Sequence, residues 1–125
     1  MITDLKINDL GILETDSRYL SVVTFTRKGL CSCAKQLVQM KRAAEYFTKE
    51  DFHVRFYSIN VDDPEILDEL LNMEEGVEEI RTPRTIYVFL GNIWGAEEGL
   101  RSTTKLIDNI FTVIGQIKEQ LGVTL

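Results

Sequence analysis

Hydrophobic residues along the chain fall into short runs separated by polar residues, and their spacing predicts alternating strands and helices. The first run is ambiguous, because the apolar residues between Leu5 and Leu13 fit neither the strand period nor the helix period. This run is compatible with a short strand, with a helix, or with one after the other. The next run, Tyr19–Thr26, is rich in β-branched and aromatic residues and predicts a strand.

A long helical pattern begins just after Gly29 and runs to about Lys49. Apolar residues recur there at spacings of three and four, which is typical of one buried stripe along a helix. The stripe consists of Leu30, Cys33, Leu37, Met40, Ala44 and Phe47. Polar residues, including Gln36 and Gln39, are predicted to lie mostly off this stripe.

The middle of the chain predicts a second strand followed by a second helix. The strand covers His53–Val61, which is mostly apolar and is expected to be internal. Asp63 can cap the following helix, and Pro64 suits its first position. We expect this helix to end at Gly76.

The last third of the chain predicts a hairpin and a final helix. Thr85–Leu90 predicts a strand, Gly91 and Asn92 a turn, and the residues from Ile93 a hairpin partner. For the final helix, Ser102 and Thr103 are candidate caps and Gly122 is the expected end. Its predicted buried stripe consists of Leu106, Ile110, Phe111, Ile114, Ile117 and Leu121.

This order of elements predicts an α/β fold in a single domain, residues 1–125. Strand–helix–strand units favour parallel pairing with right-handed crossovers. The last two strands are joined too tightly to be parallel, so they must be antiparallel. We therefore expect a mixed central sheet of about four to five strands, flanked by helices on both faces.

The composition limits the classes of partner. The chain has 125 residues and a net charge of -6, so a basic face for nucleic acid is not expected. It has no apolar run of the roughly 20 residues that span a bilayer, and we expect no membrane partner. The start shows no signal-peptide pattern, which makes the cytoplasm, where thiols stay reduced, the expected location.

The two cysteines, Cys31 and Cys33, are separated only by Ser32 and lie at the start of the predicted long helix. Inside a regular helix, residues two apart point about 200° away from each other, which prevents a disulfide without backbone movement. A bond requires Cys31 to lie in the loop before the first turn, and Gly29 is compatible with that. Alternatively, both cysteines pack as small hydrophobic residues.

A helix start also favours thiolate chemistry. Unpaired N–H groups and the helix dipole favour negative charge there, and Arg27 and Lys28 add positive charge nearby. On this interpretation, Cys31 is the exposed attacking thiol and Cys33 is the shielded thiol that resolves a mixed disulfide.

The sequence gives no indication of a metal site or a cofactor. His53 is the only histidine, and one histidine with two distant cysteines does not supply the four ligands of structural zinc. The acidic residues between Asp62 and Glu79 lack the spacing of a calcium loop, and they are interpreted as a solvated helix face and loop.

Three segments together resemble the thioredoxin superfamily: V-V-T-F followed by the cysteines and a long helix, N-V-D-D-P at 60–64, and I-R-T-P-R-T-I-Y-V-F at 80–89. The resemblance implies a thioredoxin-like fold and a thiol–disulfide oxidoreductase that acts on protein disulfides, with a reductase as a further partner. Cys31 and Cys33 would form the redox couple. The backbone of Thr82 would pair with substrate, and a cis Pro83 would face the cysteines and keep metal away from them.

The chain departs from the pattern of that superfamily at two places. This chain has C-x-C where the superfamily has W-C-x-x-C. If the two are aligned by distance from Phe25, Leu30 falls on the position of the superfamily's nucleophilic cysteine. If the loop is one residue longer, Cys31 falls on that position instead. Thr24 stands where thioredoxins carry a buried acid, and a hydroxyl cannot serve as that base. A non-catalytic binding or assembly module with vestigial cysteines is therefore the alternative function.

Overall fold

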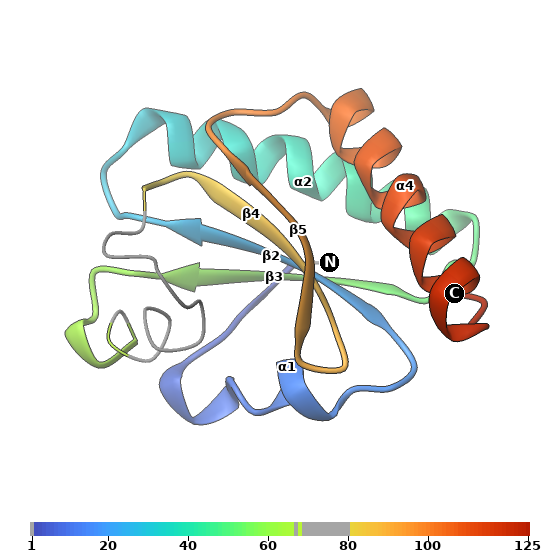
Figure 1. Cartoon of the computed structure of the whole chain (residues 1–125). Helices are drawn as coiled ribbons and strands as arrows, with labels where there is room; N and C mark the ends of the chain where they lie inside the picture. Colours follow the sequence, from blue (N-terminus) through green and yellow to red (C-terminus); the bar gives the residue numbers. More distant parts are fainter. Residues whose placement is uncertain (1, 67, 69–80) are drawn as a thin grey trace.

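The computed structural model describes residues 2–66, 68 and 81–125, and within them five strands form one sheet (Figure 1). The order across the sheet is β1-β3-β2-β4-β5. The strands are β1 (Ile2–Asp4), β2 (Leu20–Thr26), β3 (Val54–Asn60), β4 (Arg84–Phe89) and β5 (Asn92–Glu98). β1, β3 and β2 run parallel, whereas β4 is antiparallel to β2 and β5 is antiparallel to β4. The predicted mixed sheet is therefore confirmed.

Helices lie on both faces of the sheet, as predicted. The two long helices, α2 (Cys31–Lys49) and α4 (Thr103–Leu121), lie side by side over one face (Figure 1). The short helices η1 (Ile7–Asp9) and α1 (Ile12–Thr15) lie on the other face. Residues 64–66 and 68 are helical, and the other residues of the helix predicted to end at Gly76 lie outside the described residues.

The central strand β2 separates the core into two parts. Because side chains of a strand alternate between faces, Leu20 and Val22 pack toward α2 and α4, while Val23 and Phe25 pack toward α1. Every residue of β2 except its last is buried, which fits a strand covered on both sides.

The ends of the predicted helices are mostly as expected. Ser102 is the N-cap of α4, where its hydroxyl accepts a hydrogen bond from the N–H of Lys105 at 3.2 Å, and Gly122 is the C-cap. Asp63 accepts a hydrogen bond from the N–H of Glu65 at 3.0 Å, as a cap should.

The buried stripes of the two long helices differ from the predicted ones. On α4, Val113 is buried, whereas Phe111 and Leu121 are exposed. Phe111 lies at the rim of the core, with its ring 5.2 Å from those of Phe47 and Phe52. Leu30 was predicted to belong to the stripe of α2, but it precedes that helix as the N-cap and its side chain is 43% exposed.

The hairpin between β4 and β5 turns one residue earlier than predicted. Phe89 pairs with Asn92, so the turn residues are Leu90 and Gly91 instead of Gly91 and Asn92. Both have positive φ angles, 52° and 76°, which is the pattern of a two-residue type I′ turn. A glycine therefore occupies only the second of the two left-handed positions.

Candidate functional site

The two cysteines lie at the start of α2, next to the end of the central strand. β2 ends at Thr26, residues 27–30 form a loop, and α2 begins at Cys31. Cys31 and Cys33 therefore occupy the first and third helical positions, and the placement of Cys31 in the loop before the helix is not the one observed. Both thiols are free; Cys31 is exposed and Cys33 is only 2% exposed. A bond between them requires the first turn of α2 to open.

The buried thiol is held between the helix and the loop. The Sγ atom of Cys33 accepts a hydrogen bond from the N–H of Arg27, with a distance of 3.4 Å. Cys33 also lines a surface cavity of about 340 Å³, together with Leu30 and Ala34. Access to this sulfur therefore depends on the 27–30 loop.

Asp62, at the end of β3, holds that loop in place. One carboxylate oxygen accepts a hydrogen bond from the backbone N–H of Lys28 at 2.9 Å, and the other lies 3.5 Å from the guanidinium of Arg27. Asp62 was predicted to belong to a solvated acidic segment, and this role was not expected from the sequence. A signal was available, because Asp62 comes two residues after the end of β3, a strand that is parallel to β2 and thus ends at the same edge of the sheet.

Thr82 and Pro83 directly precede β4, and the peptide bond between them is cis, as the resemblance implied. Arg84 pairs with Phe25 across the sheet, which brings Pro83 beside the end of β2, where the loop to the cysteines starts. Pro83 is buried and Thr82 is half-buried. The carbonyl oxygen of Pro83 accepts a hydrogen bond from the N–H of Gly99 at 2.8 Å.

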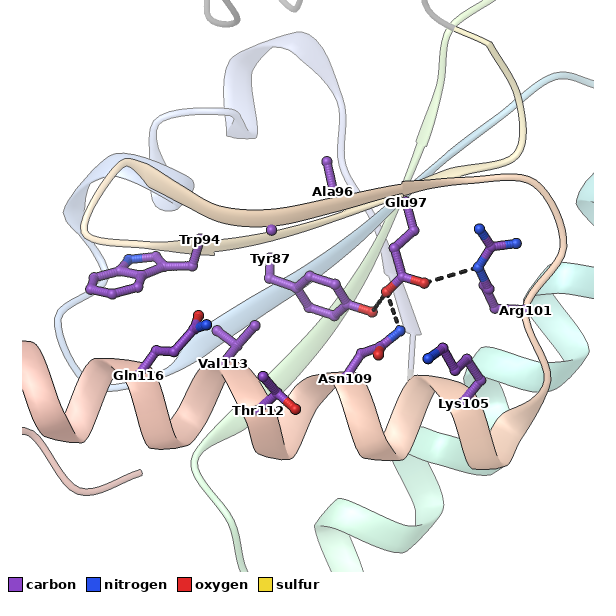
Figure 2. Close-up of a pocket in the computed structure, with 11 residues that line it drawn as sticks. Tyr87, Trp94, Ala96, Glu97, Arg101, Lys105, Asn109, Thr112, Val113 and Gln116 are labelled. Carbon is purple, nitrogen blue, oxygen red and sulfur yellow. Dashed lines mark hydrogen bonds and ion pairs between the residues drawn. The ribbon is translucent and has the colours of Figure 1, made fainter.

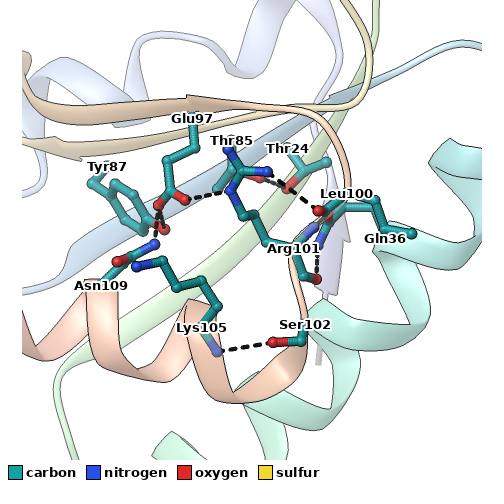
Figure 3. A network of polar contacts seen from close by, with 10 residues as sticks. All are labelled: Thr24, Gln36, Thr85, Tyr87, Glu97, Leu100, Arg101, Ser102, Lys105 and Asn109. Carbon is teal, nitrogen blue, oxygen red and sulfur yellow. Dashed lines mark hydrogen bonds and ion pairs between the residues drawn. The ribbon is translucent and has the colours of Figure 1, made fainter.

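Thr24 lies in the core, where it contacts Met40 of α2. Its hydroxyl is fully buried and pairs with the hydroxyl of Thr85 on the neighbouring strand, 3.0 Å away (Figure 3). It also donates a hydrogen bond to the sulfur of Met40. No ionisable group occupies this position, so proton transfer to or from Cys33 has no carboxylate at Thr24 to assist it.

A buried glutamine joins α2 to the segment between β5 and α4. Gln36 was predicted to lie off the buried stripe, but it is fully buried. Its amide donates to the carbonyl oxygen of Arg101 at 3.3 Å and accepts from the N–H of the same residue at 2.6 Å (Figure 3). One turn further, the side chain of Gln39 accepts hydrogen bonds from the N–H and the hydroxyl of Thr103.

A polar cavity of about 360 Å³ lies between β5 and α4 (Figure 2). At its inner side, the carboxylate of Glu97 accepts hydrogen bonds from the Tyr87 hydroxyl at 2.8 Å, from the Asn109 amide and from the Arg101 guanidinium at 2.9 Å. Burial, and then the hydrogen bond to Glu97, raise the pKa of Tyr87. The Glu97 carboxylate is fully engaged by these three donors, so we interpret the network as a support of the fold and do not assign Glu97 as a catalytic acid.

Gly95 allows this arrangement. A Cβ atom at position 95 would lie 3.2 Å from the ring of Tyr87, which is tighter than nine in ten such contacts. The Tyr87 ring thus lies directly across the backbone of β5, and its hydroxyl reaches Glu97.

Comparisons with known proteins identify the fold of the chain. No protein-family model and no curated protein matches the sequence. Among solved structures, thioredoxin from Trypanosoma brucei brucei matches with a TM-score of 0.72, 18% identity and coverage of 92% of each chain. The chain has the thioredoxin fold. Chloroplastic thioredoxin z aligns over 90% of this chain and 93% of its own, with a TM-score of 0.70 and 14% identity.

A third match comes from structural work on thiol resolution in yeast mitochondrial 1-Cys peroxiredoxin through the glutathione and thioredoxin systems. It has a TM-score of 0.68 and 18% identity, and it covers 89% of this chain and 94% of that one. At such identities the thioredoxin fold is what the likeness defines, and the chemistry has to be argued from the residues of this chain.

The described residues contain neither a membrane-spanning helix nor a cluster of metal ligands. No helix among residues 2–66, 68 and 81–125 is long and apolar enough to cross a membrane. In the same part of the chain, no three His, Cys, Asp or Glu side chains gather as metal ligands would.

Proposed function

We propose that this protein is a thiol–disulfide oxidoreductase that acts on protein disulfides, with Cys31 as the attacking thiol and Cys33 as the resolving thiol. The observation that carries the proposal is the placement of an exposed thiol at the first position of a 19-residue helix that follows the central strand of a thioredoxin fold. A buried second thiol lies two residues away.

The start of α2 suits an attacking thiolate. Leu30, at the N-cap, offers no side-chain acceptor to the free N–H groups, and the first turn contains no acid. These N–H groups and the helix dipole favour a negative charge at the end of the helix where Cys31 lies. Cys33 is shielded from solvent and therefore does not compete for the substrate.

The reaction is two successive thiol–disulfide exchanges. The Cys31 thiolate attacks one sulfur of a protein disulfide, which forms a mixed disulfide and releases the other substrate sulfur as a thiolate. The Cys33 thiolate then attacks the Cys31 sulfur, releases the second substrate thiolate and leaves a Cys31–Cys33 disulfide. The substrate has gained two electrons, and a dithiol reductase partner in the reducing cytoplasm returns them to the enzyme.

The second exchange requires the first turn of α2 to open, because the two side chains point apart in the helix. A helix that lacks a side-chain cap loses little when its first turn opens, and Leu30 provides no such cap. The residues at 82 and 83 complete the site. The half-buried Thr82 would pair through its backbone with an extended substrate segment, and Pro83 would line the site and exclude metal from the thiols.

The test is disulfide reduction with insulin as substrate and dithiothreitol as the reductant. We expect Cys31→Ser to reduce the rate to that of dithiothreitol alone, and Cys33→Ser to accumulate a mixed disulfide with Cys31, visible by mass spectrometry. Ser32→Ala, between the two thiols, is the matched control and should keep the wild-type rate. Wild-type turnover by Cys31→Ser would contradict the proposal.

A second candidate function is a binding or assembly module whose cysteines take no part in chemistry. Thr24 favours it, because its hydroxyl is already paired with Thr85 and cannot act as the buried base. The two functions differ in one measurement. In a module, mild oxidation forms no reversible Cys31–Cys33 disulfide, which mass spectrometry would detect as a loss of two hydrogens, although the exposed Cys31 thiol still reacts with iodoacetamide in the folded protein.

A further inference from the structure

The part of the chain that carries the cysteines is basic, although the protein is acidic. Residues 27–44 contain five Lys and Arg residues and no Asp or Glu, whereas the whole chain has 14 basic and 20 acidic residues. The basic residues are Arg27, Lys28, Lys35, Lys41 and Arg42. The first acid on α2 is Glu45, more than three turns beyond Cys31.

Two of these residues, Lys35 and Arg42, share one face of α2 with Cys31. Cys31, Lys35, Val38 and Arg42 are spaced by four, three and four residues, which places them on a single stripe. All four are exposed, and the opposite stripe, with Cys33, is buried. Because helical side chains tilt toward the N-terminus, Lys35 covers the turn that bears the Cys31 thiol.

Most of this positive charge is not neutralised within the described residues. Arg27 is paired with Asp62 at 3.5 Å. Ion pairs with Lys28, Lys35, Lys41 or Arg42 do not occur in residues 2–66, 68 and 81–125. The N-terminal end of the helix dipole adds further positive potential at the same place.

The basic face also has an apolar part next to the thiol. Leu30, immediately before Cys31, is 43% exposed, and Val38, two turns along the stripe, is 50% exposed. A partner that covers this face must therefore bring negative charge for the lysines and at least one apolar side chain for Leu30 or Val38.

We propose that the exposed surface around Cys31, formed by Lys28 and Leu30 of the preceding loop and by Lys35, Val38 and Arg42 of α2, selects acidic protein segments as partners. This inference rests on the proposed function, in which the selected segment carries the disulfide that Cys31 attacks. The segment has Asp or Glu near its own cysteine and an apolar residue beside it. The charges steer the segment to the face and set its orientation, and the apolar contact holds it there.

The test separates binding from chemistry by using the Cys31→Ser protein and fluorescent peptides whose cysteines are replaced by serine. Two peptides share one apolar residue and differ only in having four Glu or four Lys. We expect the Glu peptide to bind about tenfold tighter at about 0.01 M salt, and the difference to shrink strongly at about 0.15 M, where exposed charges are screened.

Charge-reversed variants locate the effect on the molecule. Lys35→Glu/Arg42→Glu should remove the preference for the Glu peptide. Lys105→Glu/Lys118→Glu on α4 changes the net charge by the same amount and should leave the preference within about twofold, because screening limits the reach of distant charges. A melting temperature close to that of the wild type shows that both variants are folded.

The proposal is overturned if the two peptides bind equally, if both charge-reversed variants weaken binding alike, or if a single-stranded DNA oligonucleotide outcompetes the Glu peptide. It is also overturned if sedimentation shows that the face is covered by a second copy of this chain. Failure of the oxidoreductase function looks different: the Glu peptide is still preferred, while wild-type protein reduces no disulfide.

Discussion

The side-chain amide of Gln36 forms two hydrogen bonds with the backbone of Arg101, donating to its carbonyl oxygen and accepting from its N–H. Two residues earlier, the N–H of Gly99 donates to the carbonyl oxygen of Pro83. Residues 99–101 therefore connect α2, one turn beyond Cys33, to the residue that precedes β4. The relative position of the thiols and the Thr82–Pro83 peptide depends on a polar group inside the core.

Replacing Gln36 by alanine should be strongly destabilising. The substitution leaves the N–H and carbonyl groups of Arg101 without their partner and opens a gap under α2, and each buried unpaired group costs about 1–3 kcal/mol. We expect the free energy of unfolding to fall by about 2–5 kcal/mol in urea titrations. Gln120→Ala, at an exposed position of α4, is the control and should change it by less than about 0.5 kcal/mol. Equal losses in both variants would show that the Gln36 bonds contribute nothing.

The paired hydroxyls of Thr24 and Thr85 should show a coupled response. Thr24→Val keeps the shape of the side chain but leaves the buried Thr85 hydroxyl without this partner, at a cost of about 1–3 kcal/mol. Replacing both residues by valine removes both polar groups, which can be nearly neutral. In a double-mutant cycle, the double variant should therefore lose less stability than the two single variants together. Strict additivity would mean that the two hydroxyls do not interact.

The elements with strong local signals were predictable from the sequence. The run of β-branched residues in β2, the cap of α4 at Ser102 and its end at Gly122 depend on neighbouring residues, and the structure confirms them. The first 15 residues have weak local signals. β1 exists because Ile2–Asp4 pairs with β3, a contact between segments more than 50 residues apart that no local pattern contains.

The candidate site was also predictable only where local sequence signals determine it. The resemblance gave the cis peptide bond before Pro83, and the helical period gave the burial of Cys33. The roles of Gln36 and Asp62 could not be obtained in that way. Each is polar, and its role follows only from a partner at the far side of the fold, Arg101 for the glutamine and the 27–30 loop for the aspartate.

Tyr87 should make the protein sensitive to alkaline pH. Burial, and then its hydrogen bond to Glu97, raise the pKa of Tyr87 above that of the unfolded chain, about 10. Below pH 10 both states hold the proton and the stability is complete. Above it, the unfolded state releases the proton while the folded state keeps it, so stability falls by up to about 1.4 kcal/mol per pH unit.

Comparison with Tyr87→Phe isolates this effect. At pH 7 the variant loses the hydrogen bond to Glu97 and should be less stable by about 1–2 kcal/mol. Above pH 10 the wild type loses stability through Tyr87 and the variant does not. The difference between their free energies of unfolding should therefore become smaller from pH 8 to 11 in urea titrations. A gap that stays constant across this range would show that Tyr87 ionises alike in both states.

Leu30 should be replaceable by serine with a gain in stability. Leucine is among the poor N-cap residues, and Leu30 leaves the first N–H groups of α2 without a side-chain acceptor, although its extended backbone suits a capping serine. Because the leucine side chain is 43% exposed, little apolar burial is lost. We expect Leu30→Ser to raise the free energy of unfolding by about 1 kcal/mol in urea titrations.

The same substitution tests whether opening of the first turn matters for the proposed exchange. A capped α2 opens its first turn less often, so Leu30→Ser should slow the formation of the Cys31–Cys33 disulfide while Cys31 alkylation continues. Leu121→Ser, at an exposed position at the end of α4, should change neither stability nor exchange. If Leu30→Ser stabilises the protein and disulfide formation keeps its wild-type rate, the two thiols meet without opening of the turn, and the geometry argued for the second exchange is wrong.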